Sequence, residues 1–91
     1  MDPVRAKFTV RNKLGLHARA ATRLVEVASR YPCEVVVSRD DQSANAKSVM
    51  GVLLLCGCQG VELEVEARGP QAEQAVAEIG ALIDGRFGEG E

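Results

Sequence analysis

Hydrophobic and polar residues alternate at the start of the chain. The even positions of residues 4–10 carry valine, alanine and phenylalanine, whereas the odd positions of residues 5–11 carry arginine, lysine and threonine. This two-residue period is typical of a strand with one face against a core and the other in water. The same reasoning predicts strands at residues 34–39, which contain three consecutive valines, at residues 43–47 after a polar turn, and at residues 61–68.

Three other segments have apolar residues at the three- and four-residue spacing of an amphipathic helix. The first is predicted to cover residues 18–30 and to end before Pro32. A short second helix is predicted to begin at Ser48, because serine is a preferred N-cap residue. The third is predicted to begin with Pro70 at its first helical position and to end at Asp84-Gly85.

The predicted order of elements is βαββαβα. Strands with one polar face favour an antiparallel sheet that helices cover on one side only. We therefore expect an α+β open-faced sandwich, with a four-stranded antiparallel sheet and three helices on one face. Ninety-one residues, of which 46% are hydrophobic and 26% charged, suit one small globular domain with a single core. The domain is expected to span residues 1–91, with a flexible tail over residues 86–91.

The chain begins without a basic segment followed by an apolar run, and no apolar stretch approaches the ~20 residues that cross a membrane. We therefore expect a soluble, cytoplasmic protein without membrane insertion. The cysteines Cys33, Cys56 and Cys58 lack a metal-ligand spacing, since one residue separates the last two. They are predicted to be buried small apolar residues, and neither a metal nor a cofactor is expected.

Charge is distributed unevenly along the chain. Residues 1–31 carry seven basic and two acidic residues, a net charge of +5, whereas the remainder carries four basic and eleven acidic residues, a net charge of −7. A basic first third favours a site that holds phosphate. Nucleic-acid binding is the competing interpretation, but the acidic remainder and an aromatic content of only 3% weaken it.

The single histidine, His17, lies where a loop is predicted to become a helix. Gly15 gives the backbone freedom to turn there. The first backbone N–H groups of a helix lack intrahelical partners, and the helix dipole adds partial positive charge, so anions bind favourably at this place. Arg19 adds a planar guanidinium suited to phosphate. The pattern predicts a histidine nucleophile that holds an anionic group, with the backbone amides of Ala18 and Arg19 as further donors. Taken alone, His17 is better interpreted as an ordinary surface histidine near a helix cap; Arg19 and Gly15 beside it favour the functional interpretation.

Residues 15–19, Gly-Leu-His-Ala-Arg, followed by Ala21-Thr22, resemble the active-site signature of the HPr family. Members of this family are the histidine-containing phosphocarriers of the phosphoenolpyruvate-dependent sugar phosphotransferase system. Residues 47–51, Lys-Ser-Val-Met-Gly, resemble the family's second signature, around a regulatory serine. The resemblance covers nearly the whole chain. It departs at Ala20, where the family usually has a proline that pre-sets the first helical turn.

The resemblance implies that His17 accepts a phosphoryl group from enzyme I, which is charged by phosphoenolpyruvate, and passes it to IIA domains of sugar permeases. Arg19 would stabilise the charge of the phosphorylated ring. The protein would then be a monomeric carrier within a relay and not a free-standing enzyme. The resemblance also makes Ser48 a candidate for regulatory phosphorylation by an HPr kinase, although in some bacteria the matching serine is present and unused.

Partner docking is expected to involve the apolar residues that follow Ser48 and one basic residue of the first helix. These candidates are Val49, Met50, Leu53 and Arg23. The three apolar residues cannot all face inward on so short a helix, so we expect a division between core and exposed surface.

Two other functions stay open at this stage. A carrier in a nitrogen-related or purely regulatory phosphotransferase chain would use the same His17 chemistry with different partners. A non-catalytic domain that binds a small ligand would explain the fold, but it would leave the pairing of His17 with Arg19 unexplained.

Overall fold

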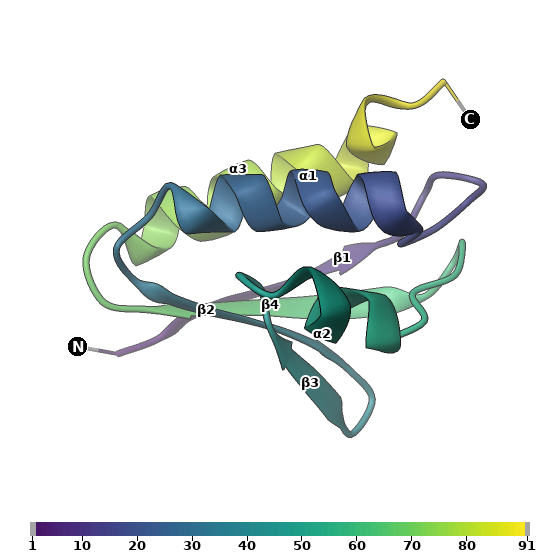
Figure 1. The fold of residues 1–91 in the computed structure, drawn as a ribbon. Coiled ribbons are helices and arrows are strands. Elements are labelled where there is room, and N and C mark those ends of the chain that lie inside the picture. The colour runs from purple at the N-terminus through teal and green to yellow at the C-terminus, as the bar shows by residue number, and fades with distance from the viewer. Residues whose placement is uncertain (1, 91) are drawn as a thin grey trace.

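The computed structural model describes residues 2–90, which form four strands and three helices (Figure 1). In chain order they are β1 (Val4–Thr9), α1 (Ala18–Ser29), β2 (Glu34–Arg39), β3 (Gln42–Asn45), α2 (Val49–Leu54), β4 (Glu62–Arg68) and α3 (Ala72–Asp84), followed by a 3₁₀ turn, η1 (Arg86–Gly88). The predicted order βαββαβα is confirmed. Among these residues no helix has the length and apolar character needed to cross a bilayer.

The strands form one sheet in the order β1-β4-β2-β3, and every neighbouring pair is antiparallel. The alternation of side chains fixes the register. Ala6 lies opposite Val65, so the apolar faces of β1 and β4 coincide. Charged pairs cross the same two strands on the alternate positions, for example Arg5 Nε to Glu66 Oε1 at 2.8 Å. One face of the sheet is therefore available for packing and the other for water.

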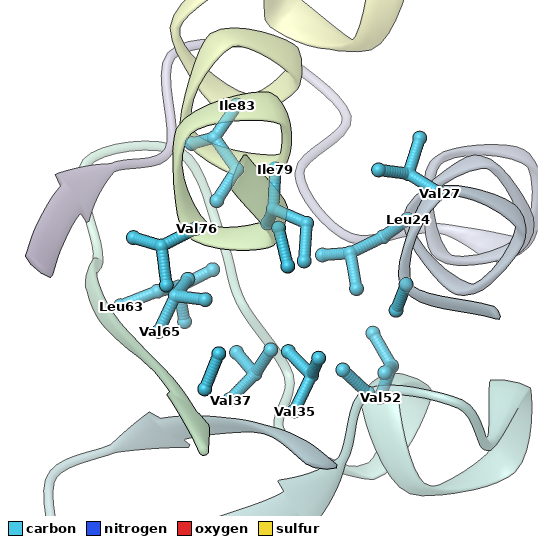
Figure 2. Packing of buried hydrophobic residues seen from close by; sticks show 14 of the residues in the cluster. Leu24, Val27, Val35, Val37, Val52, Leu63, Val65, Val76, Ile79 and Ile83 are labelled. Carbon is cyan, nitrogen blue, oxygen red and sulfur yellow. The ribbon is translucent and has the colours of Figure 1, made fainter. Parts of the chain in front are cut away.

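Helices α1 and α3 lie side by side across one face of the sheet (Figure 1). Buried apolar side chains from all three helices and from the strands form one core between these layers (Figure 2). Those labelled in the figure are Leu24, Val27, Val35, Val37, Val52, Leu63, Val65, Val76, Ile79 and Ile83. Close packing of α3 on β1 requires glycine at position 80, because a Cβ there would come within 2.2 Å of the Phe8 ring. The predicted α+β open-faced sandwich is confirmed.

Some predicted strand ends are wrong. β1 ends at Thr9 and not at residue 11, and β3 covers residues 42–45 instead of 43–47. Hydrogen bonding nevertheless continues beyond β1, since the N–H of Val10 donates to the carbonyl oxygen of Val61 at 2.9 Å. Side-chain alternation follows this extended backbone and does not reveal where regular pairing stops.

The prediction that Pro70 opens the last helix is also wrong. Gln71 is the N-cap of α3, with a left-handed φ of 63°, and the N–H of Ala72 donates to the carbonyl oxygen of Gly69 at 3.3 Å. Pro70 therefore occupies the second position of a tight turn, where its fixed φ is as favourable as in a first helical turn. Local sequence alone does not separate these two uses of proline.

Residues 86–90, named the C-terminal strap below, pack against the helices, which differs from the flexible tail expected from the sequence. Figure 1 shows this yellow segment beyond the end of α3, near the N-terminal end of α1. Phe87 is fully buried, and its carbonyl oxygen accepts a hydrogen bond from Arg23 Nη1. Burial of this aromatic ring offsets the entropy lost when the strap is ordered.

Candidate functional site

A tight turn before α1 sets the position of His17. Gly15 adopts a φ of 65°, and Asn12 Nδ2 donates to the Gly15 carbonyl oxygen at 2.8 Å. A Cβ at position 15 would come within 2.4 Å of the Gly57 carbonyl oxygen. That same oxygen accepts the N–H of Leu16 at 2.8 Å. Both the backbone conformation and the available space therefore require glycine at position 15.

His17 is the N-cap of α1, with φ −75° and ψ 177°, and its side chain makes no capping hydrogen bond. The first helical hydrogen bond runs from the N–H of Ala21 to the His17 carbonyl oxygen at 2.8 Å. The amides of Ala18, Arg19 and Ala20 thus precede the hydrogen-bonded part of the helix, and no acidic residue lies in the first turn. The imidazole therefore lies at the positive end of the helix dipole. The His17 side chain is 28% exposed.

His17 borders an open depression of about 670 Å³. Its lining comes from the loop before α1, the start of α1 and the C-terminal strap: Lys13, Leu14, His17, Ala18, Arg19, Glu89 and Gly90. The structure thus brings His17, Ala18 and Arg19 to one surface. The Arg19 side chain is exposed there, and a guanidinium can offer a phosphate two parallel N–H donors.

Glu89 is the residue of this site that sequence reasoning missed. Its Oε2 forms a hydrogen bond with His17 Nε2, and its Oε1 accepts one from Asn12 Nδ2 at 2.9 Å. Two hydrogen bonds lower the pKa of the Glu89 carboxyl: the one from Asn12 has the larger effect, and the one from His17 the smaller. The carboxyl is therefore ionised at neutral pH. The contact joins residues 72 positions apart. The only sign of it in the sequence is Phe87, an aromatic residue in a glycine-rich end.

Arg23, predicted to take part in docking, is turned toward the C-terminal strap. Its side chain donates to the Phe87 carbonyl oxygen and also lies close to Gly88, where a Cβ would be 2.9 Å from Arg23 Nη1. Arg23 therefore connects the middle of α1 to the strap. Its contribution to partner docking remains a prediction.

Ser48 is the N-cap of α2, as predicted. Its Oγ accepts a hydrogen bond from the N–H of Gly51 at 3.1 Å. At the other end of this short helix, Arg39 Nη1 donates to the carbonyl oxygens of Leu55 (3.0 Å) and Cys56 (2.7 Å). Side chains thus satisfy both ends of α2, which stabilises a helix too short to persist alone.

The apolar residues of α2 divide between interior and surface, as expected. Met50 is 66% exposed, whereas Val49 and Leu53 are half-buried against the core. Two further leucines that the sequence did not single out, Leu54 and Leu14, are 69% and 68% exposed. Large exposed apolar side chains are candidates for contact with a partner.

The prediction that all three cysteines are buried is correct for Cys33 and wrong for Cys56 and Cys58, whose side chains are exposed free thiols. Helix α2 ends before them, and Cys56 takes a left-handed φ of 53°. The chain there forms a surface loop that presents the Gly57 carbonyl oxygen to Leu16. Among the described residues, no three side chains of the metal-ligating types come together.

The basic residues of the first third do not form an uninterrupted surface. Four of them lie within 4.0 Å of a carboxylate oxygen, in the pairs Arg5–Glu66, Lys7–Glu62, Arg11–Asp84 and Arg30–Glu78. A nucleic-acid surface needs basic groups that face phosphates without competing carboxylates. The distribution of charge therefore favours a local anion site at His17 over nucleic-acid binding.

Comparison with known proteins identifies relatives over nearly the whole chain. The family model described as "PTS HPr component phosphorylation site" matches residues 4–85. The phosphocarrier protein HPr of Pseudomonas aeruginosa is 45% identical over 86 residues, which cover 93% of this chain and 96% of that protein. The phosphocarrier protein NPr of Escherichia coli is 40% identical over 87 residues, which cover 94% of this chain and 97% of that protein.

The fold has close counterparts among solved structures. The crystal structure of HPr-C-His from Thermoanaerobacter tengcongensis superposes with a TM-score of 0.89 at 36% sequence identity, over the full length of both chains. The similarity to known proteins therefore includes the arrangement of the sheet and helices as well as the two sequence motifs.

Proposed function

The chain belongs to the HPr family of phosphocarrier proteins, and we propose that His17 accepts a phosphoryl group from enzyme I and passes it to a IIA domain. The proposal includes a cytoplasmic location and a monomeric state, both of which are expectations from the sequence analysis. The observation that supports it most strongly is the position of His17. This residue caps α1 with its backbone only, so its imidazole is available for chemistry beside the amides of Ala18 and Arg19.

The transfer is a nucleophilic substitution at phosphorus. A nitrogen lone pair of the neutral imidazole forms the new N–P bond while the bond from phosphorus to the donor breaks, and the electron pair of that bond stays with the donor. The transferred phosphoryl group brings negative charge to the start of α1. Arg19 and the amides at the start of α1 offset this charge.

The openness of the site suits a carrier. His17 must meet the active site of a donor and later that of an acceptor, and it lies in a depression open to solvent. A single arginine and a helix end hold the phosphoryl group less tightly than a closed metal site would. Moderate stabilisation lets the group leave again, since tight ground-state binding would raise the barrier to the next transfer.

Incubation with radiolabelled phosphoenolpyruvate and enzyme I tests this proposal. The wild-type chain should acquire an acid-labile label, and His17→Ala should acquire none while its circular dichroism spectrum remains that of the wild type. The partly exposed N-cap side chain contributes little to packing, so this variant is expected to fold. Labelling of His17→Ala at the wild-type rate would refute the assignment.

A carrier role in a nitrogen-related phosphotransferase chain is the second candidate function. The similarity to the NPr protein of Escherichia coli supports it nearly as well as the similarity to HPr proteins supports the sugar chain. Phosphorylation rates measured in parallel with enzyme I of the sugar system and with its nitrogen-related counterpart distinguish the two. The physiological donor should be the faster by a large factor, because transfer depends on docking as well as on His17.

We also propose that Ser48 is a site of inhibitory phosphorylation where the cell contains a suitable kinase. Ser48 is partly exposed, and a phosphate at the N-terminus of α2 would be stabilised by the helix dipole. The exposed Met50 lies two residues further along the same helix. A charged group beside this apolar contact would raise the desolvation cost of docking without altering His17.

A further inference from the structure

We propose that Glu89 is the positioning residue of the reaction: its carboxylate fixes the proton of His17 on Nε2 and so directs the Nδ1 lone pair to phosphorus. The inference rests on the proposed role of His17 as phosphoryl acceptor. It adds a residue that lies beyond both signature motifs, and even beyond residues 4–85 of the family match.

Both oxygens of Glu89 have a hydrogen-bond partner. Oε2 lies against His17 Nε2 and Oε1 accepts from Asn12 Nδ2. An ionised carboxylate is an acceptor only, so the hydrogen of the contact with His17 belongs to the ring. A neutral imidazole has one N–H, and the hydrogen bond at one nitrogen decides which nitrogen carries it. Protonation of Nε2 leaves the lone pair on Nδ1.

Asn12 fixes the orientation of this carboxylate. It is the only buried polar or charged residue among residues 2–90, with an exposed fraction of 0%. Its Nδ2 donates both to Glu89 and to the carbonyl oxygen of Gly15, in the turn that leads into His17. Asn12 therefore ties the turn, the carboxylate and, through the carboxylate, the imidazole into one geometry.

The C-terminal strap holds Glu89 in place from the other side. Phe87 is fully buried two residues earlier, and its carbonyl oxygen is bound by Arg23 of α1. Gly88 then turns the chain with a φ of 78°. The Glu89 side chain, only 15% exposed, is thus delivered to His17 by a packed segment.

The contact also suits the charge changes of the transfer. When Nδ1 forms its bond to phosphorus, the bond between phosphorus and the donor breaks and the donor keeps that electron pair. The ring keeps its Nε2–H and becomes a phosphoimidazolium, whose positive charge faces the Glu89 carboxylate. In the onward transfer the N–P electron pair returns to Nδ1, and the ring is neutral again without having gained or lost a proton.

Glu89→Gln is the discriminating variant because it keeps the shape and removes one acceptor. Asn12 and His17 bind different oxygens of Glu89, and in glutamine one of these two positions is an NH₂ donor, so only one of the two partners keeps its acceptor. Nitrogen-15 spectra of the imidazole in the unphosphorylated protein report the tautomer directly. We expect the Nε2–H form in the wild type, a clear shift toward the Nδ1–H form in Glu89→Gln and Glu89→Ala, and no change in Glu73→Gln, which removes an exposed glutamate of α3.

Transfer rates from enzyme I complete the test. Glu89→Gln and Glu89→Ala should accept the phosphoryl group about ten- to a hundredfold more slowly, by analogy with the loss found when the carboxylate partner of a metal-binding histidine is removed, and Glu73→Gln should match the wild type. An unchanged tautomer in Glu89→Gln, an Nδ1–H ring in the wild type, or a shifted tautomer with an unchanged rate would each overturn the inference. A wild-type protein that enzyme I fails to label would instead refute the proposed function, because the tautomer is measured without any transfer.

Discussion

Arg19 and a lysine at the same position would differ in shape as well as in basicity. The guanidinium is planar and can donate two parallel hydrogen bonds to a phosphoryl group, whereas the ammonium is a compact point charge. We predict that Arg19→Lys slows phosphoryl acceptance by about tenfold, equivalent to about 1.4 kcal/mol of transition-state stabilisation. A rapid-quench time course of labelling by enzyme I measures this rate.

Arg68→Lys is the matched control for Arg19→Lys, because Arg68 is an exposed arginine at the end of β4. It should transfer at the wild-type rate. Equal rates for Arg19→Lys and wild type would reduce the contribution of Arg19 to its charge alone.

Alanine substitutions at Gly15 and Gly60 distinguish two costs of a side chain at a glycine: backbone strain at positive φ and steric clash of the added Cβ. Both glycines have positive φ, 65° and 91°. A Cβ at Gly15 would lie 2.4 Å from the Gly57 carbonyl oxygen, whereas a Cβ at Gly60 would meet nothing within 4 Å. We predict that Gly60→Ala lowers the free energy of unfolding by about 1–2 kcal/mol and that Gly15→Ala lowers it by about 3 kcal/mol or more, since overpacking adds to strain.

Urea denaturation followed by circular dichroism measures both glycine variants. Gly15→Ala should also slow phosphoryl acceptance, because the turn that it distorts positions His17. Equal destabilisation by the two substitutions would show that the contact of Gly15 with Gly57 does not restrict this turn.

At the scale of elements, α2 depends on the cap at Ser48. Ser48→Ala removes the hydrogen bond to the N–H of Gly51 and should lower the free energy of unfolding by about 1 kcal/mol. Ser48→Asp should retain the stability, because aspartate is an equally good N-cap and its charge suits the helix N-terminus. Ser29→Ala, an exposed serine at the end of α1, is the control, and thermal unfolding is the measurement.

The same pair of variants tests the docking proposal. Ser48→Asp should be phosphorylated by enzyme I several-fold more slowly than the wild type, and Ser48→Ala at nearly the wild-type rate. If Ser48→Asp accepts phosphate as fast as the wild type, a charge at this helix start does not impede docking, and Ser48 acts only as a cap.

The C-terminal strap combines local strain with strong packing. Arg86 and Phe87 both adopt positive φ, 58° and 54°, at a cost of about 1–3 kcal/mol each. Burial of the Phe87 ring offsets much of that cost. Phe87→Ala should therefore release the strap and lower the free energy of unfolding by about 3 kcal/mol, the low end for a buried phenylalanine, because the released residues lose their strain.

Denaturant titration of Phe87→Ala measures this loss, with Leu54→Ala as the control at a 69% exposed position. The control should change the stability by less than about 0.5 kcal/mol. An unchanged unfolding midpoint for Phe87→Ala would mean that the strap contributes nothing to the stability of the domain.

At the scale of the whole molecule, the sequence predicts the fold because each element carries its own local signal. The alternation around Ala6 and Val65 identifies strands whose apolar faces must meet, and the capping preference of Ser48 marks a helix start. Cross-strand register then follows from burial of one face, since a slip of one residue would expose the whole apolar set. Gly15, His17 and Arg19 are likewise close in the chain, so one motif locates them.

Features that depend on contacts between distant segments could not be predicted in this way. The role of Glu89 arises only when the strap folds back over α1, and Arg23 faces that strap because Phe87 finds a place in the core. Exposure of Cys56 depends on how the loop after α2 meets Leu16. The prediction that Pro70 begins α3 was wrong for a different reason, because tight turns and first helical turns favour the same proline φ.

The most direct test of the central claim is to follow one phosphoryl group through the protein. The chain is charged with phosphoenolpyruvate and enzyme I, the modified residue is mapped by mass spectrometry under alkaline conditions, and purified IIA domains are then added. The account predicts a single acid-labile phosphoryl group on His17 that disappears from the chain as it appears on a IIA domain. A phosphoryl group on another residue, or one on His17 that no IIA domain of the same cell removes, would contradict it.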